Sequence, residues 1–313
     1  MVTIKATFTR ELDKESENLI YLLSAGSRRP VADLARDLRL SRRQVELRMR
    51  KLLKGQLLQH YAVVNAGLGL RATILLRLRK VDAPLLASLQ KLPAVKFVRE
   101  TLGVYDLHMV CFVPSREGMD SVVQEVGRLC HGRILRFDVL LHSWASPLGY
   151  KAFCHNAELL NQFQLKMPQE RAIPQSELRV LELIRREPLL SYRALAVQSG
   201  MGYRSLRTAL RALEGSGVLR FSIVMNYPLL GLQYDYMLCQ VDPNRREEFE
   251  RYALTHPRVH WLKRGQGRWE YVLSIVSRNN SEFIDTTRQI RAQVAVLDST
   301  ALIAKVAYDW TTA

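Results

Sequence analysis

The residues of this sequence that are best suited to binding chemistry are basic, and many of them lie in one short segment. Residues 36–54 contain eight lysines and arginines and two acids, which gives this segment a net charge of +6. Apolar spacing predicts a helix here with Val45 turned inward, so that Arg43, Leu47 and Arg50 point away from the core. An exposed face of Arg, Gln and Lys can contact phosphates and base edges in a major groove. The segment therefore predicts binding to double-stranded DNA.

A second helix with the same pattern is predicted from residue 203 to residue 214. With Leu206 inward, Arg204 and Arg211 lie on its outer face, and residues 203–220 carry a net charge of +3. We therefore expect the first helix to contribute more DNA affinity than the second. The predicted DNA-contacting residues are Ser41, Arg42, Arg43, Gln44, Leu47, Arg48, Arg50, Lys51, Lys54, Arg204, Ser205, Arg207, Thr208 and Arg211.

The two helices occupy equivalent places in a sequence that repeats itself. At an offset of 161 residues, Leu34-Ala35 matches Leu195-Ala196, and at an offset of 164 Gly103 matches Gly267. Such a repeat predicts two tandem copies of a unit of about 150 residues. Each copy has three helical patterns, with Ser41 as the N-cap of the third in the first copy and Gly202 in its place in the second.

After the helices, the periodicity changes to that of strands, in the order β-α-β-β-α-β of a ferredoxin-like fold. We expect an α+β protein with two copies of a winged helix-turn-helix followed by such a domain. The expected units are helix-turn-helix domains at 1–65 and 173–228, β-α-β-β-α-β domains at 66–150 and 229–313, and a linker at 151–172. One face of each small sheet has no helices and needs a partner. The two sheets can pair within the chain or between chains, as a pseudo-dimer or a homo-oligomer.

A turn containing Gly103 separates the two middle strands of the first copy. Its spacing favours a plain hairpin, and the rim of a ligand pocket is the alternative. The element order and the run Thr101-Leu-Gly103-Val-Tyr105-Asp106 resemble the Lrp/AsnC (feast/famine) family of transcriptional regulators. The resemblance implies a regulatory (RAM-type) domain that binds an amino acid near this turn, and DNA binding through the third helix. It places Gly103, Tyr105 and Asp106 at an effector site, and less securely Gly267, Trp269 and Glu270.

Siroheme decarboxylases share this domain order and offer an enzymatic alternative. They carry a stretch like His-Asn-Tyr-x-Arg, with a further histidine, in the strand before the turn. This sequence has Val-Lys-Phe-Val-Arg-Glu at 95–100 and Val-His-Trp-Leu-Lys-Arg at 259–264, and His256 and His260 are its nearest approach to that motif. We therefore expect a sequence-specific regulator and no enzyme, with a fused siroheme-decarboxylase-like enzyme as the alternative.

Composition limits the remaining function classes. The chain has 46 Lys and Arg against 30 Asp and Glu, a net charge of +16, and 48% hydrophobic residues. A globular protein this basic is expected to bind a polyanion. The four cysteines have no paired spacing, which excludes a disulfide framework and a zinc site. No apolar run is long enough to span a membrane. The sequence thus predicts a cytoplasmic protein without a metal, a cofactor or a membrane partner.

Overall fold

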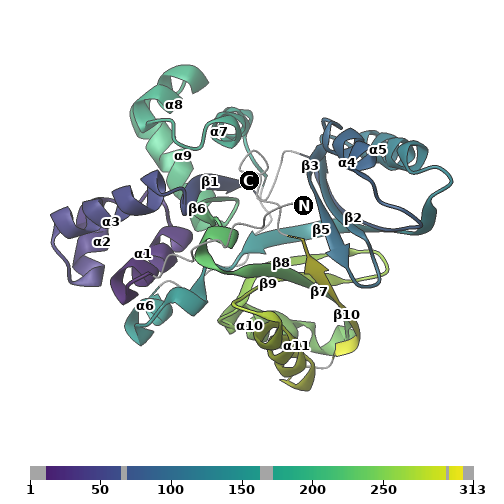
Figure 1. The fold of residues 1–313 in the computed structure, drawn as a ribbon. Coiled ribbons are helices and arrows are strands. Elements are labelled where there is room, and N and C mark those ends of the chain that lie inside the picture. Colours follow the sequence, from purple (N-terminus) through teal and green to yellow (C-terminus); the bar gives the residue numbers. More distant parts are fainter. Residues whose placement is uncertain (1–11, 65–68, 163–171, 294–295, 306–313) are drawn as a thin grey trace.

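The protein, described here from a computed structural model, consists of two helical units and a β-barrel (Figure 1). The structure describes residues 12–64, 69–162, 172–293 and 296–305. Each helical unit has three helices and one strand. The first unit contains α1 (Lys14–Ala25), α2 (Val31–Leu38), α3 (Arg42–Lys54) and β1 (Leu58–Val64), and the second α7 (Gln175–Arg186), α8 (Tyr192–Ser199), α9 (Tyr203–Gly215) and β6 (Leu219–Met225).

The start of the third helix differs between the two units, as the sequence predicts. Ser41 caps α3 in a capping box, in which the Ser41 hydroxyl accepts from the backbone of Gln44 and the Gln44 side chain accepts from the backbone of Ser41. Gly202 precedes α9 and provides no side-chain cap. The N-terminus of α3 is therefore fixed by two hydrogen bonds that α9 lacks.

The two helical units are joined to each other through their strands. β1 pairs with β6 in antiparallel register from Leu58–Met225 to Val64–Leu219, so each unit supplies half of a two-stranded sheet. Arg28, which follows α1, donates to the backbone carbonyls of Pro188 and Leu190 in the other unit. The two helical units therefore pack as one body.

The barrel takes its strands from both halves of the chain. The first half supplies β2 (Leu70–Leu78), β3 (Val95–Leu102), β4 (Leu107–Val113) and β5 (Ile134–Pro147), and the second β7 (Gln233–Val241), β8 (Val259–Gln266), β9 (Tyr271–Ser277) and β10 (Val296–Ala304). The spatial order β10-β3-β4-β2-β5-β8-β9-β7 closes on itself. Within each half, this order is that of a ferredoxin-like sheet.

Two seams join the halves of the barrel. At the first, β5 pairs with β8 from Leu141–Gln266 to Pro147–Trp261. At the second, the described parts of β3 and β10 pair at Leu102–Ile303 and Thr101–Ala304, and the backbone N–H of Lys305 donates to the carbonyl of Glu100. Edge-to-edge pairing thus merges the two expected sheets into one barrel, and the domain boundaries expected from the sequence stay a prediction. The partner of each sheet, left open by the sequence, lies in the same chain.

Four helices cover the outside of the barrel. They are α4 (Ala83–Gln90) and α5 (Arg116–Leu129) on the first half, and α10 (Arg246–Thr255) and α11 (Asn280–Gln293) on the second (Figure 1). Short helical segments complete the connections: η1 (Lys151–Phe153), α6 (Ala157–Gln162), η2 (Pro228–Leu230) and η3 (Pro243–Arg245). Because the helices take one sheet face, the other face of every strand lines the barrel interior. Within the described residues, no helix has the length and apolarity that crossing a membrane requires.

Candidate active site

The barrel interior contains a cluster of basic and aromatic side chains, which we call the interior cluster. Its members are Phe97 and Arg99 on β3, His108 on β4, Tyr236 on β7 and Lys263 on β8. Alternation along the strands explains their position, since Val98 and Met109 beside them belong to the apolar core under α4 and α5. His108 is 0% exposed and Lys263 is 7% exposed, so both lie out of contact with bulk water.

The Phe97 ring lies at the centre of this cluster. The guanidinium carbon of Arg99 is 4.8 Å from the Phe97 ring centroid, and the ammonium of Lys263 is 5.9 Å from it. The His108 ring is 5.5 Å from Phe97 and stacks on Tyr236 at 4.0 Å. The Tyr236 hydroxyl accepts a hydrogen bond of 2.5 Å from Arg99. Arg99 from the first half of the chain and Lys263 from the second therefore both lie near the Phe97 ring, beside the stacked rings of His108 and Tyr236.

The interior cluster carries positive charge without compensating acids. Among the described residues, no carboxylate lies within ion-pair distance of Arg99 or Lys263, although ion pairs are common elsewhere on the chain. Burial and the neighbouring Arg99 and Arg71 lower the pKa of Lys263 from 10.5 to about 7. Burial, Lys263 and Arg99 hold the pKa of His108 well below 6.5, which keeps this imidazole neutral.

Two further features mark the interior as a binding site. Neither ring nitrogen of His108 has a hydrogen-bond partner among the described residues. On the other side, Thr73 Oγ1 lies 2.9 Å from His142 Nε2, and burial lowers the pKa of His142 well below 6.5. Buried polar groups are normally satisfied, so an imidazole with two free nitrogens beside two cations is typical of a functional site.

The two turns predicted to bind an effector contact each other inside the barrel. Trp269 Nε1 donates to the Tyr105 hydroxyl at 2.9 Å, and that hydroxyl donates to Asp138 at 2.6 Å. Tyr105 and Trp269 are both buried. A Cβ on Gly103 would lie 2.7 Å from the carbonyl oxygen of Ala301 in β10. The Cβ of an alanine at Gly267 would lie 2.3 Å from a carbonyl oxygen of β5. Both glycines thus permit close strand packing at the seams.

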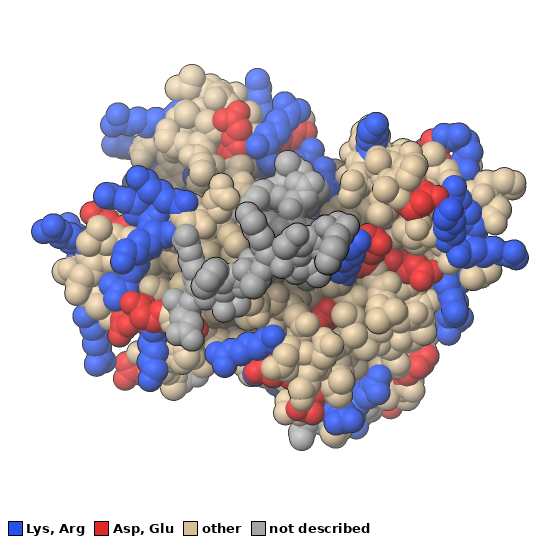
Figure 2. Space-filling view, in the orientation of Figure 1, with Lys and Arg blue, Asp and Glu red and all other residues tan. Residues whose placement is uncertain are grey.

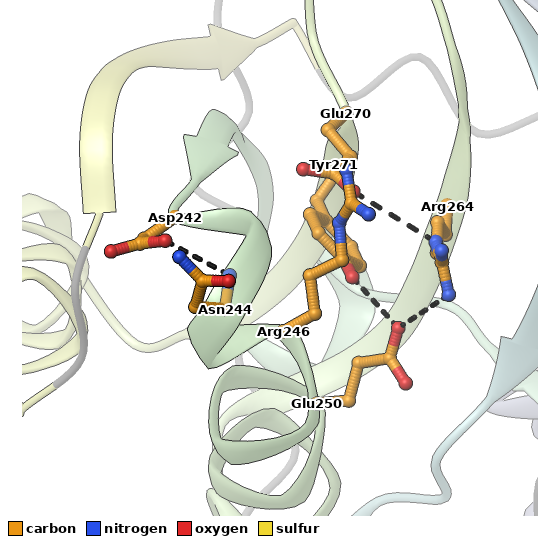
Figure 3. Close-up of polar contacts among 7 residues, drawn as sticks. All are labelled: Asp242, Asn244, Arg246, Glu250, Arg264, Glu270 and Tyr271. Carbon is orange, nitrogen blue, oxygen red and sulfur yellow. Dashed lines mark hydrogen bonds and ion pairs between the residues drawn. The ribbon is translucent and has the colours of Figure 1, made fainter.

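The acidic residues of these turns bond to the protein itself. Asp106 accepts from the backbone of Leu78 at 2.7 Å. Glu270 lies in the network of Figure 3, 2.5 Å from Arg246 at the start of α10 and 3.9 Å from Arg264 on β8. Glu250 completes the network by accepting from Tyr271 and pairing with Arg264. These contacts attach α10 to the barrel. An effector site at the turns stays a prediction.

The predicted DNA-contacting residues are mostly exposed, on α3 and α9. Lysines and arginines gather over α2 and α3 and around α8 and α9 (Figure 2). Two residues of α3 have side-chain partners within the protein: Arg48 pairs with Asp13 of the α1 cap at 3.1 Å, and Gln44 accepts from the backbone of Ser41 in the capping box of α3 itself. The remaining arginines and lysines of the prediction are exposed and have no ion pair among the described residues: Arg42, Arg43, Arg50, Lys51, Lys54, Arg204, Arg207 and Arg211.

The sequence interpretation missed the interior cluster. His108 was given no role there, and Arg99 and Lys263 were treated only as parts of the stretches 95–100 and 259–264, which lack the decarboxylase motif. A signal was available, because Arg99 and Lys263 are related by the same offset of 164 residues as Gly103 and Gly267. Equivalent cations in two strands that otherwise bury apolar residues indicate a shared internal site.

Comparison with solved structures places the whole chain in one fold. The crystal structure of the siroheme decarboxylase NirDL matches 93% of this chain and 91% of its own, with a TM-score of 0.56 and 18% identity. Its co-complex with an iron-uroporphyrin III analogue matches the same shares, with a TM-score of 0.54 and 16% identity. No protein-family model and no curated protein sequence matches the chain.

Single halves resemble transcriptional regulators. The leucine response regulatory protein LrpA of Mycobacterium tuberculosis matches 44% of this chain and 96% of its own, with a TM-score of 0.38 and 17% identity. A regulator from Neisseria meningitidis in complex with L-Met matches 42% of this chain and 89% of its own, with a TM-score of 0.37 and 22% identity.

The comparison corrects one expectation from the sequence. We expected no enzyme, but the structures that match the chain over nearly its full length are those of a decarboxylase. The expectation was wrong because it relied on the absence of a sequence motif from β3 and β8. A fold similar to that of the entire chain thus occurs in an enzyme.

Proposed function

We propose that this protein is a decarboxylase that acts on a carboxylate-bearing iron tetrapyrrole bound in the barrel interior. One observation carries the proposal: Arg99 and Lys263 meet inside the barrel with no carboxylate paired to either in the described part of the chain. The full-length likeness to siroheme decarboxylase NirDL supports it.

The charge of the interior cluster favours a ligand with several carboxylates. Burying a cation without a counter-ion costs several kcal/mol, so such groups are rarely retained for stability alone. A tetrapyrrole carboxylate placed against Arg99 and Lys263 would supply the missing negative charge. In a site shielded from water, these charge-assisted bonds are stronger than they are on the surface.

The aromatic members of the cluster fit the flat part of such a ligand. Tyr236 stacks on His108, and the Tyr234 ring meets Tyr236 edge-on at 5.7 Å. The guanidinium of Arg99 lies 4.8 Å from the Tyr234 ring centroid. A macrocycle can pack against these rings while its carboxylates reach the cations. These contacts with rings and cations support binding of both parts of a carboxylated tetrapyrrole.

The reaction follows from this placement. In a decarboxylation, the bond between the carboxylate and its neighbouring carbon breaks, CO₂ leaves, and the carbon gains a proton. An interior without bulk water removes the hydration that stabilises the starting carboxylate and lets fixed side chains orient it. Arg99, held by Tyr236, is placed to orient the leaving carboxylate.

Titration with iron-uroporphyrin III and incubation with siroheme test the proposal. We expect a shift of the visible absorption bands on binding, and loss of CO₂ from siroheme by mass spectrometry. Arg99→Met should weaken binding at least tenfold, because it removes the fixed cation. The control Lys80→Met removes an exposed cation outside the cluster and should bind like the wild type. Wild-type protein that neither binds nor converts either tetrapyrrole would contradict the proposal.

DNA binding by α3 is a second candidate function, favoured by its exposed cations. On this proposal, the helical units are the winged helix-turn-helix domains of the Lrp/AsnC type, with RAM-type halves in the barrel and the boundaries given above. The capping box on α3 and the net charge of +6 over residues 36–54 support it. Such binding would accompany the enzymatic activity, and affinity should fall steeply with salt.

A titration with duplex DNA at low salt tests this second function. Arg43→Ala should weaken binding more than Arg204→Ala, because α3 carries more charge and a fixed N-terminus. Both residues are exposed, so each substitution leaves the core intact. Equal losses would contradict the ranking, and no binding to any duplex would exclude the function.

A further inference from the structure

The two halves of the barrel place different cations at the same position. Arg99 on β3 and Lys263 on β8 are separated by 164 residues, the same offset that relates the two glycine turns. β3 and β8 occupy equivalent places in their halves, each hydrogen-bonded to the strand that follows it. The Phe97 ring lies close to both cations. A common ancestral position thus carries a guanidinium in one half and an amine in the other.

The contacts of these two cations differ as much as their chemistry. Arg99 is fixed by its hydrogen bond to the Tyr236 hydroxyl and by the rings of Phe97 and Tyr234. The Lys263 ammonium has no hydrogen-bond or ion-pair partner among the described residues. Its one polar contact there is with the Phe97 ring. Arginine is always charged and suits an anchoring role, whereas a buried lysine can exchange its proton near neutral pH.

The titratable groups that interact with Lys263 come from four other strands of the barrel, and none of those recorded is acidic. The charged and titratable groups recorded as acting on Lys263, or as being acted on by it, are Arg99 on β3, Arg71 on β2, His108 on β4 and His142 on β5. Burial is the largest cause that lowers the pKa of Lys263 to about 7, followed by Arg99 and Arg71. Both histidines are held neutral by burial. Lys263 is therefore the interior group that titrates near neutrality.

We propose that Lys263 is the proton donor to the carbon that loses CO₂, and that Arg99 holds the departing carboxylate. The inference rests on the proposed decarboxylase function. It assigns substrate binding to one of the two equivalent positions and proton donation to the other. The C–C bond breaks, its electron pair stays on the side-chain carbon, and CO₂ leaves from Arg99. The Lys263 ammonium gives its proton to that carbon and becomes a neutral amine. The step needs no oxidant or reductant, and the amine regains a proton from water when the product leaves.

Two conservative substitutions, Lys263→Arg and Arg99→Lys, distinguish binding of the substrate carboxylate from proton donation. Lys263→Arg keeps the positive charge but cannot release a proton near neutral pH. We expect it to bind iron-uroporphyrin III within a few-fold of wild type, while the single-turnover rate with saturating siroheme falls about 10²- to 10⁴-fold, the usual contribution of a general acid. Arg99→Lys should instead weaken binding at least tenfold and lower the saturated single-turnover rate by less than Lys263→Arg does.

The pH dependence of the single-turnover rate distinguishes a proton donor from a residue that only supports the fold, because a structural role would leave this dependence unchanged. The wild-type single-turnover rate should decline as pH rises above about 7, because the donor is lost as the amine deprotonates. The residual rate of Lys263→Arg should show no such decline. Thermal unfolding of each variant checks that the fold is kept.

The possible outcomes distinguish the two proposals. A Lys263→Arg variant that keeps the wild-type rate, or a wild-type rate that does not fall with pH, would overturn the assignment of Lys263 and leave the decarboxylase function standing. A Lys263→Arg variant that loses binding in proportion to its rate would show that Lys263 anchors the substrate. A wild type without binding or turnover would overturn both proposals.

Discussion

Removing the amine of Lys263 should stabilise the folded protein at neutral pH, although it should abolish the proposed proton transfer. The pKa of this amine falls from 10.5 to about 7 on folding. Because the folded state binds its proton more weakly than the unfolded state does, protonation favours unfolding. This penalty is complete below the folded pKa and disappears above the unfolded one. Lys263→Met, which has a similar length, should therefore be more stable than the wild type.

The size of this effect follows from the two pKa values. Each pKa unit is worth about 1.4 kcal/mol, so the amine costs the folded state roughly 4 kcal/mol at pH 7 and about 1 kcal/mol at pH 10. We expect Lys263→Met to raise the free energy of unfolding by an amount that shrinks over this range. The methyl thioether also buries apolar surface, but that gain is independent of pH.

Urea unfolding of both proteins at pH 7 and pH 10 measures the difference. The control Lys80→Met replaces an exposed lysine and should change stability little at either pH. Equal gains for Lys263→Met at both pH values would refute the argument, because a buried amine must produce a gradient. A loss of stability at pH 7 would show that Lys263 is compensated by a group in the folded protein.

Three further substitutions test the packing of the fold. Gly267→Ala should lower the free energy of unfolding by about 1–3 kcal/mol or more, since its Cβ would overlap the backbone of β5. Differential scanning calorimetry measures this loss. The control Gly127→Ala should show no such loss, because its Cβ meets nothing within 4 Å. Tyr105→Phe should cost about 1–3 kcal/mol, because the buried indole N–H of Trp269 loses its acceptor, and an unchanged urea midpoint would speak against this bond. Ser41→Ala should cost about 1 kcal/mol through loss of the α3 cap, with a matching drop in melting temperature.

Local features of the fold could be predicted from the sequence because they depend on neighbouring residues. The Ser41 cap, the uncapped start of α9 after Gly202 and the β-α-β-β-α-β order all follow from short patterns. Closure of the barrel could not be predicted in this way. The pairing of Leu102 with Ile303 joins residues 201 positions apart, and no local pattern fixes the register of such distant strands.

The candidate site was missed for a related reason. His108 and Arg99 are adjacent partners across β3 and β4, but Lys263 and Tyr236 reach them only through the closed barrel. In sequence, these residues lie among other polar residues of their strands, such as Lys96 in β3 and His260 in β8, so no local pattern sets them apart. Their combined chemistry becomes visible only when the helix-free faces of both halves are brought together.

The position of β10 in the barrel has a consequence for synthesis on the ribosome. β3 lies early in the sequence, but its edge partner β10 follows all the other described strands, so β3 leaves the ribosome well before β10 does. Until then, the open edges of β3 and β5 expose backbone groups that can pair with a neighbouring nascent chain. Closure of the barrel must therefore wait for β10, and chains that stop before β10 should aggregate rather than form a half-sized domain.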